Sequence, residues 1–351
     1  MSAQFTSLDS SATAWIALAS AQRVSPKLWL QALEQHQCSP IELLSQASSL
    51  GSAVTTLTEQ ITQKHIDTAL NWAKASENRH VITLDSPDYP PLLKQLDSPP
   101  LVLFATGSKA LLKQPQIAIV GSRRASIQGK RIATDFAMGL SNNGIAITSG
   151  LAMGIDSAAH VGAISGSIGT IAVMGTGPDK IYPAKNSKLY NEIHDSGGVS
   201  VTEFFPGQGP KPWHFPRRNR IIAALSLGTL VVEAKIKSGT LITANLAADM
   251  GRDVFAVPGS LFHAYSEGCH WLIQQGAKLV TNVNDILLEI GVQPQQMSFD
   301  VGEQNEKSAV NSLATDKLLA SVEYDITAID VIAQRNALSV SQAMASLLEY
   351  E

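Results

Sequence analysis

The sequence predicts an α/β protein whose centre is an extended, Rossmann-like, doubly wound parallel sheet. Two consecutive segments, beginning at Ile117 and Ile145, each pass from a short apolar β-rich run through a Gly- or Ser-containing turn into a helical pattern. About eight such apolar runs lie between residues 101 and 280, most of them separated by helical periodicity. Strands that alternate with helices in this way form parallel sheets with helical crossovers. Residues 1–77 and 309–351 lack this alternation and predict a small helical domain at each end of the chain.

Composition places the chain among soluble globular proteins with more than one domain. The 351 residues are 44% hydrophobic and 16% charged. No run approaches the ~18 apolar residues of a membrane-spanning helix, and the first ten residues lack the basic start of a secretion signal. We therefore expect a cytoplasmic protein. Cys38 and Cys269, the two cysteines, are too few for a disulfide framework or a zinc quartet, so we expect neither a metal nor a cofactor.

Charge is unevenly distributed along the chain. Residues 77–296 contain 19 basic and 16 acidic residues, whereas residues 297–351 contain 3 basic and 9 acidic ones. The positive excess of residues 77–296 attracts a polyanionic partner, and the negative excess of residues 297–351 repels it. Any such partner is expected on the central segment.

The N-terminal segment, residues 1–77, predicts short helices. Apolar residues recur at helical spacing, and the pairs Ser25-Pro26 and Ser39-Pro40 each place a capping residue before a proline suited to the first turn. The segment has no ligand-like cluster, so a structural or interaction role is favoured over an active site.

The central domain, residues 78–296, carries the predicted strands. Leu101–Phe104 is expected to be the first buried strand of the sheet. The strands that follow are expected at residues 117–120, 145–148, 169–174, 199–202, 229–233, 254–257 and 278–280.

The first candidate binding turn is Gly121-Ser122-Arg123-Arg124, which follows the strand at 117–120. In parallel sheets, ligands bind beyond the carboxyl ends of the strands, and this turn offers amides, a hydroxyl and two guanidinium groups to an anion. It matches neither the Gly-x-Gly-x-x-Gly fingerprint nor a P-loop. An ordinary strand-to-helix turn is the alternative interpretation.

The second candidate is the segment Lys211–Arg220, KPWHFPRRNR, with four cations and three aromatic rings. Single strands of nucleic acid are held by cations on phosphates and flat rings against bases. A helix that starts near Pro216 would carry Arg217, Arg218 and Arg220 in its first turns. In the alternative interpretation, Trp213 and Phe215 belong to the core and the arginines pair with residues such as Glu203 or Glu233.

Two further segments are ambiguous. Lys237-Ser238-Gly239-Thr240 precedes a predicted helix and suits either an anion site or ordinary capping. After a polar linker at residues 297–308, residues 309–351 predict three short helices, at 313–319, 328–332 and 340–348, as in an incomplete winged-helix-like domain. Its excess of acidic residues favours a role in protein contact or packing over DNA recognition.

The motifs together resemble the DNA-processing protein A family, called DprA or Smf. The similarity is carried by GSRRAS at 121–126, SGLAMGIDSAAH at 149–160, IYPAKN at 181–186, FPRRNRIIAALS at 215–226, VVEAKIKSGTLITA at 231–244 and GCHWLIQQGA at 268–277. The helical ends also fit the family's three-part layout, with a SAM-like first domain. Pro178 and Gln274 depart from the family pattern, and no DNA contact is assigned near Gln274.

This resemblance implies a protein that binds and protects single-stranded DNA, forms homodimers and loads the RecA recombinase during natural transformation, with single-strand binding protein as a further partner. It implies no catalytic residue. The expected nucleic-acid-binding residues are Gly121, Ser122, Arg123, Arg124, Lys211, Phe215, Arg217, Arg218, Asn219, Arg220, Lys237, Ser238, Gly239 and Thr240.

The alternative from another class is a nucleotide-binding hydrolase of the phosphoribohydrolase type, with Asp156, Glu203 or Glu233 as its acid or base. A helical interaction protein is a third hypothesis. For the homodimer, we expect an apolar contact through the last sheet unit, from Trp271, Leu272, Ile273, Ile286, Leu287 and Ile290.

Overall fold

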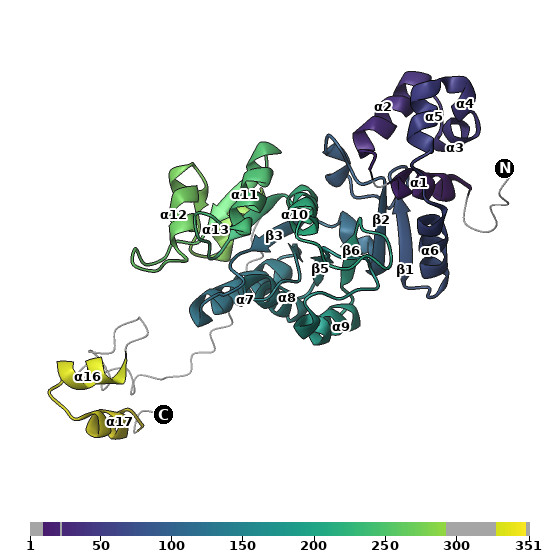
Figure 1. Cartoon of the computed structure of the whole chain (residues 1–351). Coiled ribbons are helices and arrows are strands. Elements are labelled where there is room, and N and C mark those ends of the chain that lie inside the picture. Colours follow the sequence, from purple (N-terminus) through teal and green to yellow (C-terminus); the bar gives the residue numbers. More distant parts are fainter. Residues whose placement is uncertain (1–9, 22, 293–327, 349–351) are drawn as a thin grey trace. The chain divides into compact units, whose positions relative to one another are not determined.

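The computed structural model of the chain describes residues 10–21, 23–292 and 328–348 (Figure 1). The chain divides into two compact units, Met1–Gln295 and Gln296–Glu351. The first unit contains the sheet and all the helices that cover it.

The sheet has nine strands in the order β1-β2-β6-β5-β4-β3-β7-β8-β9. From β6 to β9 every neighbouring pair is parallel, which confirms the predicted doubly wound core. The strands are β1 (Arg79–Thr83), β2 (Val102–Gly107), β3 (Gln116–Val120), β4 (Ala146–Ser149), β5 (Thr170–Val173), β6 (Val199–Thr202), β7 (Gly228–Val231), β8 (Asp253–Ala256) and β9 (Lys278–Leu279).

The sheet is parallel, as predicted, except at one edge. A strand at Arg79–Thr83 precedes the one expected to be first, and β2 pairs antiparallel both with β1 and with β6. The connection from β1 to β2 contains only the 3-10 turn η1 (Leu93–Gln95). A parallel pair needs a long crossover, usually a helix, whereas an antiparallel pair does not.

Helices cover both faces of the sheet (Figure 1). Ile117 and Ile119 of β3 share a core with residues of α7, α8 and α13, whereas Ala118 and Val120 share a core with residues of α10, α11 and α12. This alternation follows from the two-residue period of a strand. The helices of this part are α7 (Ile127–Asn142), α8 (Ile155–Ile164), α9 (Ser187–Asp195), α10 (His214–Leu225), α11 (Gly239–Asp249), α12 (Glu267–Gln274) and α13 (Val283–Glu289), with short 3-10 turns η2 (Lys109–Lys113) and η3 (Ala184–Asn186).

The N-terminal segment is helical, as predicted. Ser25 and Ser39 cap two of its helices, and Ser39 forms a capping box with Glu42, so both predicted helix starts are confirmed. α1 and α6 pack against β1, and Trp15, Trp29 and Trp72 join the core under that edge. The helices are α1 (Ser10–Ser20), α2 (Pro26–His36), α3 (Pro40–Ser45), α4 (Ala47–Leu50), α5 (Ser52–Thr58) and α6 (Gln63–Lys74).

The second unit is described over two helices, α16 (Ile329–Arg335) and α17 (Val340–Leu348). Ile332, Ala333 and Ala343 are buried between them. Both match helices expected from the sequence. The linker at 297–308 and the helix expected at 313–319 lie outside the described residues, and the division at residue 77 stays a prediction.

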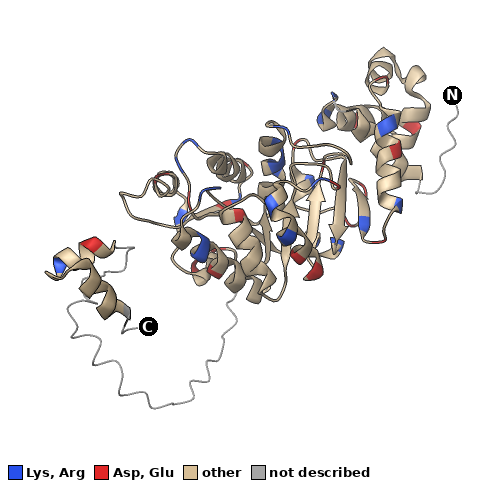
Figure 2. Ribbon diagram, turned by 60° about the horizontal axis from the view of Figure 1, so that its bottom comes forward, with Lys and Arg blue, Asp and Glu red and all other residues tan. Residues whose placement is uncertain are grey.

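In the part of the chain that the structure describes, no helix is long and apolar enough to cross a membrane. α10 contains Arg217, Arg218 and Arg220, and the Lys and Arg positions of the ribbon are drawn blue in Figure 2.

Candidate nucleic-acid interface

A groove of about 850 Å³ opens at the carboxyl ends of β3 and β7. These strands are neighbours, yet the chain continues from them toward opposite edges of the sheet. The strand after β3 is β4, beside β3 on one side, and the strand after β7 is β8, beside β7 on the other side. Such a switch point leaves a crevice between the two outgoing loops. Twelve of the fourteen predicted binding residues line it: Gly121, Ser122, Arg123, Arg124, Lys211, Phe215, Arg218, Asn219, Lys237, Ser238, Gly239 and Thr240.

The turn after β3 is held by the loop after β7. The amide of Ser122 donates to the main-chain oxygen of Glu233 at 2.8 Å, and the amide of Ser126 donates to its carboxylate at 3.0 Å. A side chain at Gly129 would overlap that carboxylate, and one at Gly121 would overlap Ile155 of α8. Both glycines therefore permit close packing that fixes the position of Arg123 and Arg124.

Phe215 is the aromatic surface of the groove. Its ring lies 5.5 Å from the ring of Tyr182, centroid to centroid, and the guanidinium carbon of Arg123 lies 5.5 Å from the centre of the Phe215 ring. Arg123 is exposed and Phe215 is partly exposed. A ring and a cation that meet in this way can hold a base and its phosphate.

Arg218 lies beneath the groove floor and is 4% exposed. Its Nη1 donates to the main-chain oxygens of Gly150, at 2.6 Å, and of Val173. Burial lowers the pKa of Arg218 to about 10, so it remains a cation at neutral pH. Burial also raises the pKa of nearby Asp156, against the opposing effects of Arg218 and of two amides, those of Gly150 and Ala152, that donate to its carboxylate. Arg218 thus positions the ends of β4 and β5.

Two predicted binding residues, Arg217 and Arg220, do not line the groove. Both donate to the same carboxylate oxygen of Glu203, at 2.9 and 2.6 Å, and Arg220 also donates to the main-chain oxygen of Ser98. Both arginines thus form the pairs with Glu203 that the alternative interpretation names, and their role in DNA binding stays a prediction. They are three residues apart and share one side of α10, while Arg218 points to another side.

The turn before α11 brings polar groups to the opposite wall. Ser238 is the N-cap residue of α11, but its side chain makes no capping hydrogen bond. Its hydroxyl is buried and has no hydrogen-bond partner among the described residues. Of the two interpretations of this turn, capping and anion binding, the structure favours anion binding, because the hydroxyl of Ser238 is available to a ligand at the start of a helix.

Sequence reasoning missed one cation and two aromatic residues of the groove. Lys235 lies 5.1 Å from the ring centre of Tyr265, and both residues line the groove together with Tyr182. Lys235 could have been found because it stands two residues before Lys237. Tyr265 could not, because it comes from the separate loop after β8.

Electrostatics in the groove are dominated by cations. Arg123, Arg124, Lys211, Arg218, Lys235 and Lys237 line it against a single acidic residue, Asp156. Six cations against one acid is a larger excess than the 19 basic against 16 acidic residues of the whole central segment. This excess makes the groove attractive to an anion.

The candidate acids and bases of the hydrolase alternative are all held by other groups of the protein. Asp156 accepts main-chain amides, Glu203 accepts two arginines, and Glu233 accepts the amide and hydroxyl of Ser126. Within the described ranges, no three His, Cys, Asp or Glu residues gather as metal ligands would.

Half of the residues expected at a dimer contact fill the core of the protomer itself. Leu272, Ile286 and Leu287 are at most 4% exposed, so that part of the expectation was wrong. Leu279 and Leu288 of the same sheet unit are exposed instead. A homodimer stays a prediction.

Comparison with known proteins identifies the family of this chain. Residues 80–291 match the family model described as DNA recombination-mediator protein A. The chain is 40% identical over 296 residues to Protein Smf of Escherichia coli (strain K12), which covers 82% of this chain and 78% of that protein. It is 49% identical over 201 residues to DNA processing protein DprA of Streptococcus pneumoniae, which covers 57% of this chain and 71% of the relative.

Two solved structures are similar. The X-ray structure of DNA processing protein A from Streptococcus pneumoniae has a TM-score of 0.68 at 38% identity, covering 79% of this chain and 97% of that one. A structure of DNA processing protein A from Helicobacter pylori, described for its single-stranded DNA binding mode, has a TM-score of 0.55 at 29% identity, covering 60% and 95%. Because the family model matches residues 80–291 and Protein Smf is 40% identical over 82% of this chain, the chain belongs to the DNA recombination-mediator protein A family.

Proposed function

We propose that the groove at the β3–β7 switch point binds single-stranded DNA. The observation that carries this proposal is the meeting of Arg123, Phe215 and Tyr182 inside a groove whose other cations outnumber its one acid. Cations attract the phosphates, and the ring of Phe215 offers a face to a base. The structure of the Helicobacter pylori relative, described for its single-stranded DNA binding mode, supports the same ligand class.

The groove favours single strands over duplex because the ring of Phe215 reaches only the face of an unpaired base. Fluorescence anisotropy with a labelled oligonucleotide, alone and annealed to its complement at the same salt concentration, measures this difference. We expect tighter binding of the single strand. Equal affinity for the two forms would contradict the proposal.

We further propose that the protein is a loader and not an enzyme. It protects incoming single strands in the cytoplasm and hands them to RecA during natural transformation, as a homodimer that also meets single-strand binding protein. Binding dominated by phosphate contacts is strong, tolerant of sequence and reversible, which suits transfer to another protein. Two grooves on one dimer would raise the affinity for a strand that reaches both.

The loader hypothesis is tested by RecA filament formation on single strands precoated with single-strand binding protein. We expect the protein to shorten the lag before RecA filaments form, and we expect the Arg123→Ala variant to leave that lag long. If the protein binds DNA but does not change the lag, the loading proposal is wrong and the binding proposal still holds.

The hydrolase alternative makes a separate prediction. Incubation with nucleoside monophosphates would release free base, detectable by chromatography. We expect no release above the level of a buffer control. Release that is lost in Asp156→Asn would favour the enzyme instead.

A further inference from the structure

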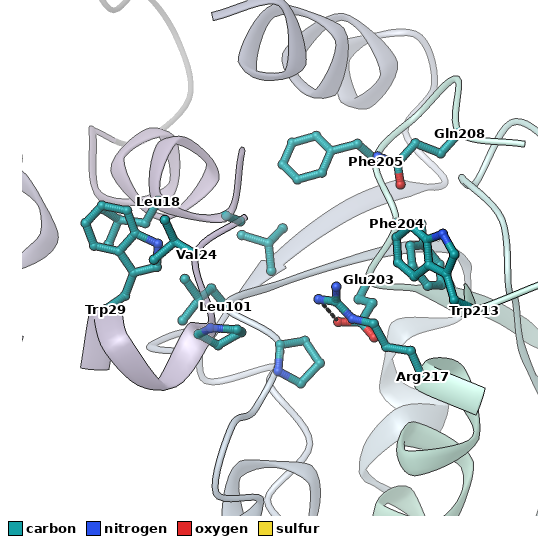
Figure 3. Close-up of a pocket in the computed structure, with 14 residues that line it drawn as sticks. Leu18, Val24, Trp29, Leu101, Glu203, Phe204, Phe205, Gln208, Trp213 and Arg217 are labelled. Carbon is teal, nitrogen blue, oxygen red and sulfur yellow. Dashed lines mark hydrogen bonds and ion pairs between the residues drawn. The ribbon is translucent and has the colours of Figure 1, made fainter. Parts of the chain in front are cut away.

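A second pocket lies beside the first turn of α10 (Figure 3). One wall comes from the N-terminal helical segment, with Leu18, Val24 and Trp29, and the other from the end of β6 and from α10, with Glu203, Phe204, Trp213 and Arg217. The groove does not use these residues.

Glu203 gives the pocket an unsatisfied acceptor. Its side chain is 3% exposed, and both arginines that pair with it, Arg217 and Arg220, donate to the same oxygen, Oε2. The other oxygen, Oε1, is buried and accepts no hydrogen bond from the residues that the structure describes. A buried carboxylate oxygen is costly without a donor, so the pocket suits a ligand that brings an N–H group.

Trp213 gives the pocket an aromatic surface at its mouth. Its side chain is 53% exposed, unusually high for a ring that packs edge to face with Phe204, at 6.3 Å, and with His214. The ammonium of Lys211 lies 5.6 Å from the centre of its ring. An exposed ring beside a cation matches a base and its phosphate.

The pocket and the groove are joined along the chain. Lys211 lines the groove and contacts Trp213, which lines the pocket, and Phe215 two residues later returns to the groove. A strand that leaves the groove at Lys211 can therefore reach Trp213.

We propose that this pocket is a second base site that reads an exocyclic amino group. The ring of one nucleotide lies on Trp213, its amino group donates to Oε1 of Glu203, and Lys211 and the partly exposed Arg217 attract its phosphate. Adenine, cytosine and guanine carry such an amino group. Thymine does not, and its one N–H lies between two carbonyl oxygens that a carboxylate repels. The inference rests on the proposed single-strand binding.

The size of the pocket fits this assignment. The volume of the pocket is about 60 Å³, and a cavity needs a volume of roughly 10–15 Å³, expressed in the same way, to hold one water molecule. The pocket therefore admits the edge of a base, while the ring stays at the mouth on Trp213.

The experiment uses oligodeoxythymidine in which one residue at a time is replaced by deoxyuridine or deoxycytidine, a pair that differs at a keto and an amino group. Lengths of roughly 5 and 20 nucleotides bracket the site sizes of single-strand-binding modules, about 4–16 nucleotides. We expect deoxycytidine to bind about ten- to hundredfold more tightly than deoxyuridine at one or two adjacent positions of the longer strand, the range for a hydrogen bond to a charged group.

Three variants connect this preference to the pocket. Glu203→Gln keeps an oxygen for the arginines and turns an NH₂ donor toward the base, so the preference should vanish or reverse. Val24→Phe fills the pocket from the opposite wall without changing Glu203 and should also abolish the preference. Trp213→Ala should weaken the longer strand about tenfold whatever its base, and Trp213→Phe should recover most of this loss. Glu192→Gln, on the exposed face of α9, is the control and should change nothing.

The outcomes separate this inference from the proposed function. If oligodeoxythymidine does not bind at all, single-strand binding itself is wrong. If it binds, and weakens in Arg123→Ala, but no position distinguishes deoxycytidine from deoxyuridine, only the second base site is wrong. A preference that persists in both Glu203→Gln and Val24→Phe would likewise overturn it, and thermal denaturation of each variant shows that the fold is intact.

Discussion

Arg218 donates from Nη1 to the main-chain oxygen of Gly150 at 2.6 Å, from α10 to the residue that follows β4. A side chain at Gly150 would overlap the guanidinium group, so the glycine and the arginine depend on each other. The contact places a buried cation under the groove and satisfies an oxygen at the end of the sheet. Arg218 is therefore a positioning residue of the proposed site, and its effect on DNA binding should follow its effect on stability.

Arg218→Ala should lower the free energy of unfolding by about 3 kcal/mol, because it removes donors from two main-chain oxygens and a cation from beside Asp156. Arg218→Lys should recover little of this stability, since a lysine ammonium cannot reproduce the planar set of donors of a guanidinium group. Urea denaturation of the unliganded protein measures both. Arg217→Ala is the matched control, expected to cost less than about 1 kcal/mol because Arg217 is 39% exposed and Arg220 still pairs with Glu203. Equal costs for Arg217→Ala and Arg218→Ala would show that Arg218 has no special structural role.

Arg123→Ala should weaken single-strand binding and reduce the steepness of log K against log salt by about 0.7, the contribution of one phosphate contact. Arg123 is exposed in the groove beside Phe215. Titrations at several salt concentrations give the slope. Arg131→Ala removes the same charge from the exposed face of α7, where Arg131 lies near Asp135, and should leave the slope unchanged. If the two variants gave the same slope, Arg123 would not be a phosphate contact.

Gly154→Ala should disrupt the turn at residues 121–126, because the added carbon would lie 2.2 Å from the main-chain oxygen of Ser122 and Gly154 has φ +84°. We expect a loss of at least ~2 kcal/mol of stability, together with weaker DNA binding. Gly144→Ala is the control, with φ +81° but no atom within 4 Å of the added carbon. It should cost only the backbone strain, about 1 kcal/mol, and leave binding intact. Similar effects of the two changes on binding would show that the overlap at Ser122 is unimportant.

Stability should fall as the pH drops below neutrality, in part through His160. This residue is fully buried, and burial together with Arg218 lowers its pKa to about 3. Thr170 donates its hydroxyl to Ile147, so it accepts from Nδ1 of His160, and Nε2 accepts the amide of Leu151 at 3.3 Å. The folded state therefore needs the neutral ring, with no room for a second proton.

The sign follows from the two pKa values. The unfolded chain takes up a proton on His160 near pH 6.5, whereas the folded chain takes it up only near pH 3. Between these values stability decreases by up to about 1.4 kcal/mol per pH unit from this group, and above pH 6.5 its contribution is constant. His160→Gln should make the dependence shallower by that amount in urea denaturation at pH 4 to 6.5. An unchanged dependence would mean that His160 is not buried in its neutral form.

Much of the molecule could be predicted from local sequence. The runs at 117–120 and 145–148 became β3 and β4, and the Ser-Pro pairs at 25–26 and 39–40 start α2 and α3. The apolar pattern of a strand and the capping residue of a helix each involve only a few neighbouring residues, so they can be recognised in the sequence without knowledge of the fold. The motifs at 121–124 and 237–240 also lie together because parallel strands deliver their carboxyl ends to one edge.

The antiparallel edge was not predictable in the same way. β2 begins as an apolar run like the others, whereas β1 begins with Arg79 and His80, and the sequence does not state the direction in which either strand pairs. That direction depends on whether the connection crosses the sheet. The same holds for Tyr265, which reaches the groove from a loop that follows β8.

The sequence alone determined that cations and rings gather between Lys211 and Arg220, but only the tertiary structure decided what each of them does. Successive residues of a helix point about 100° apart, so Arg217 and Arg220 turn to Glu203 while Arg218 turns under the groove. Their partners are 14, 17 and 68 residues away in sequence. The role of a charged side chain is set by the groups that surround it after folding, because a buried cation must be satisfied where it lies.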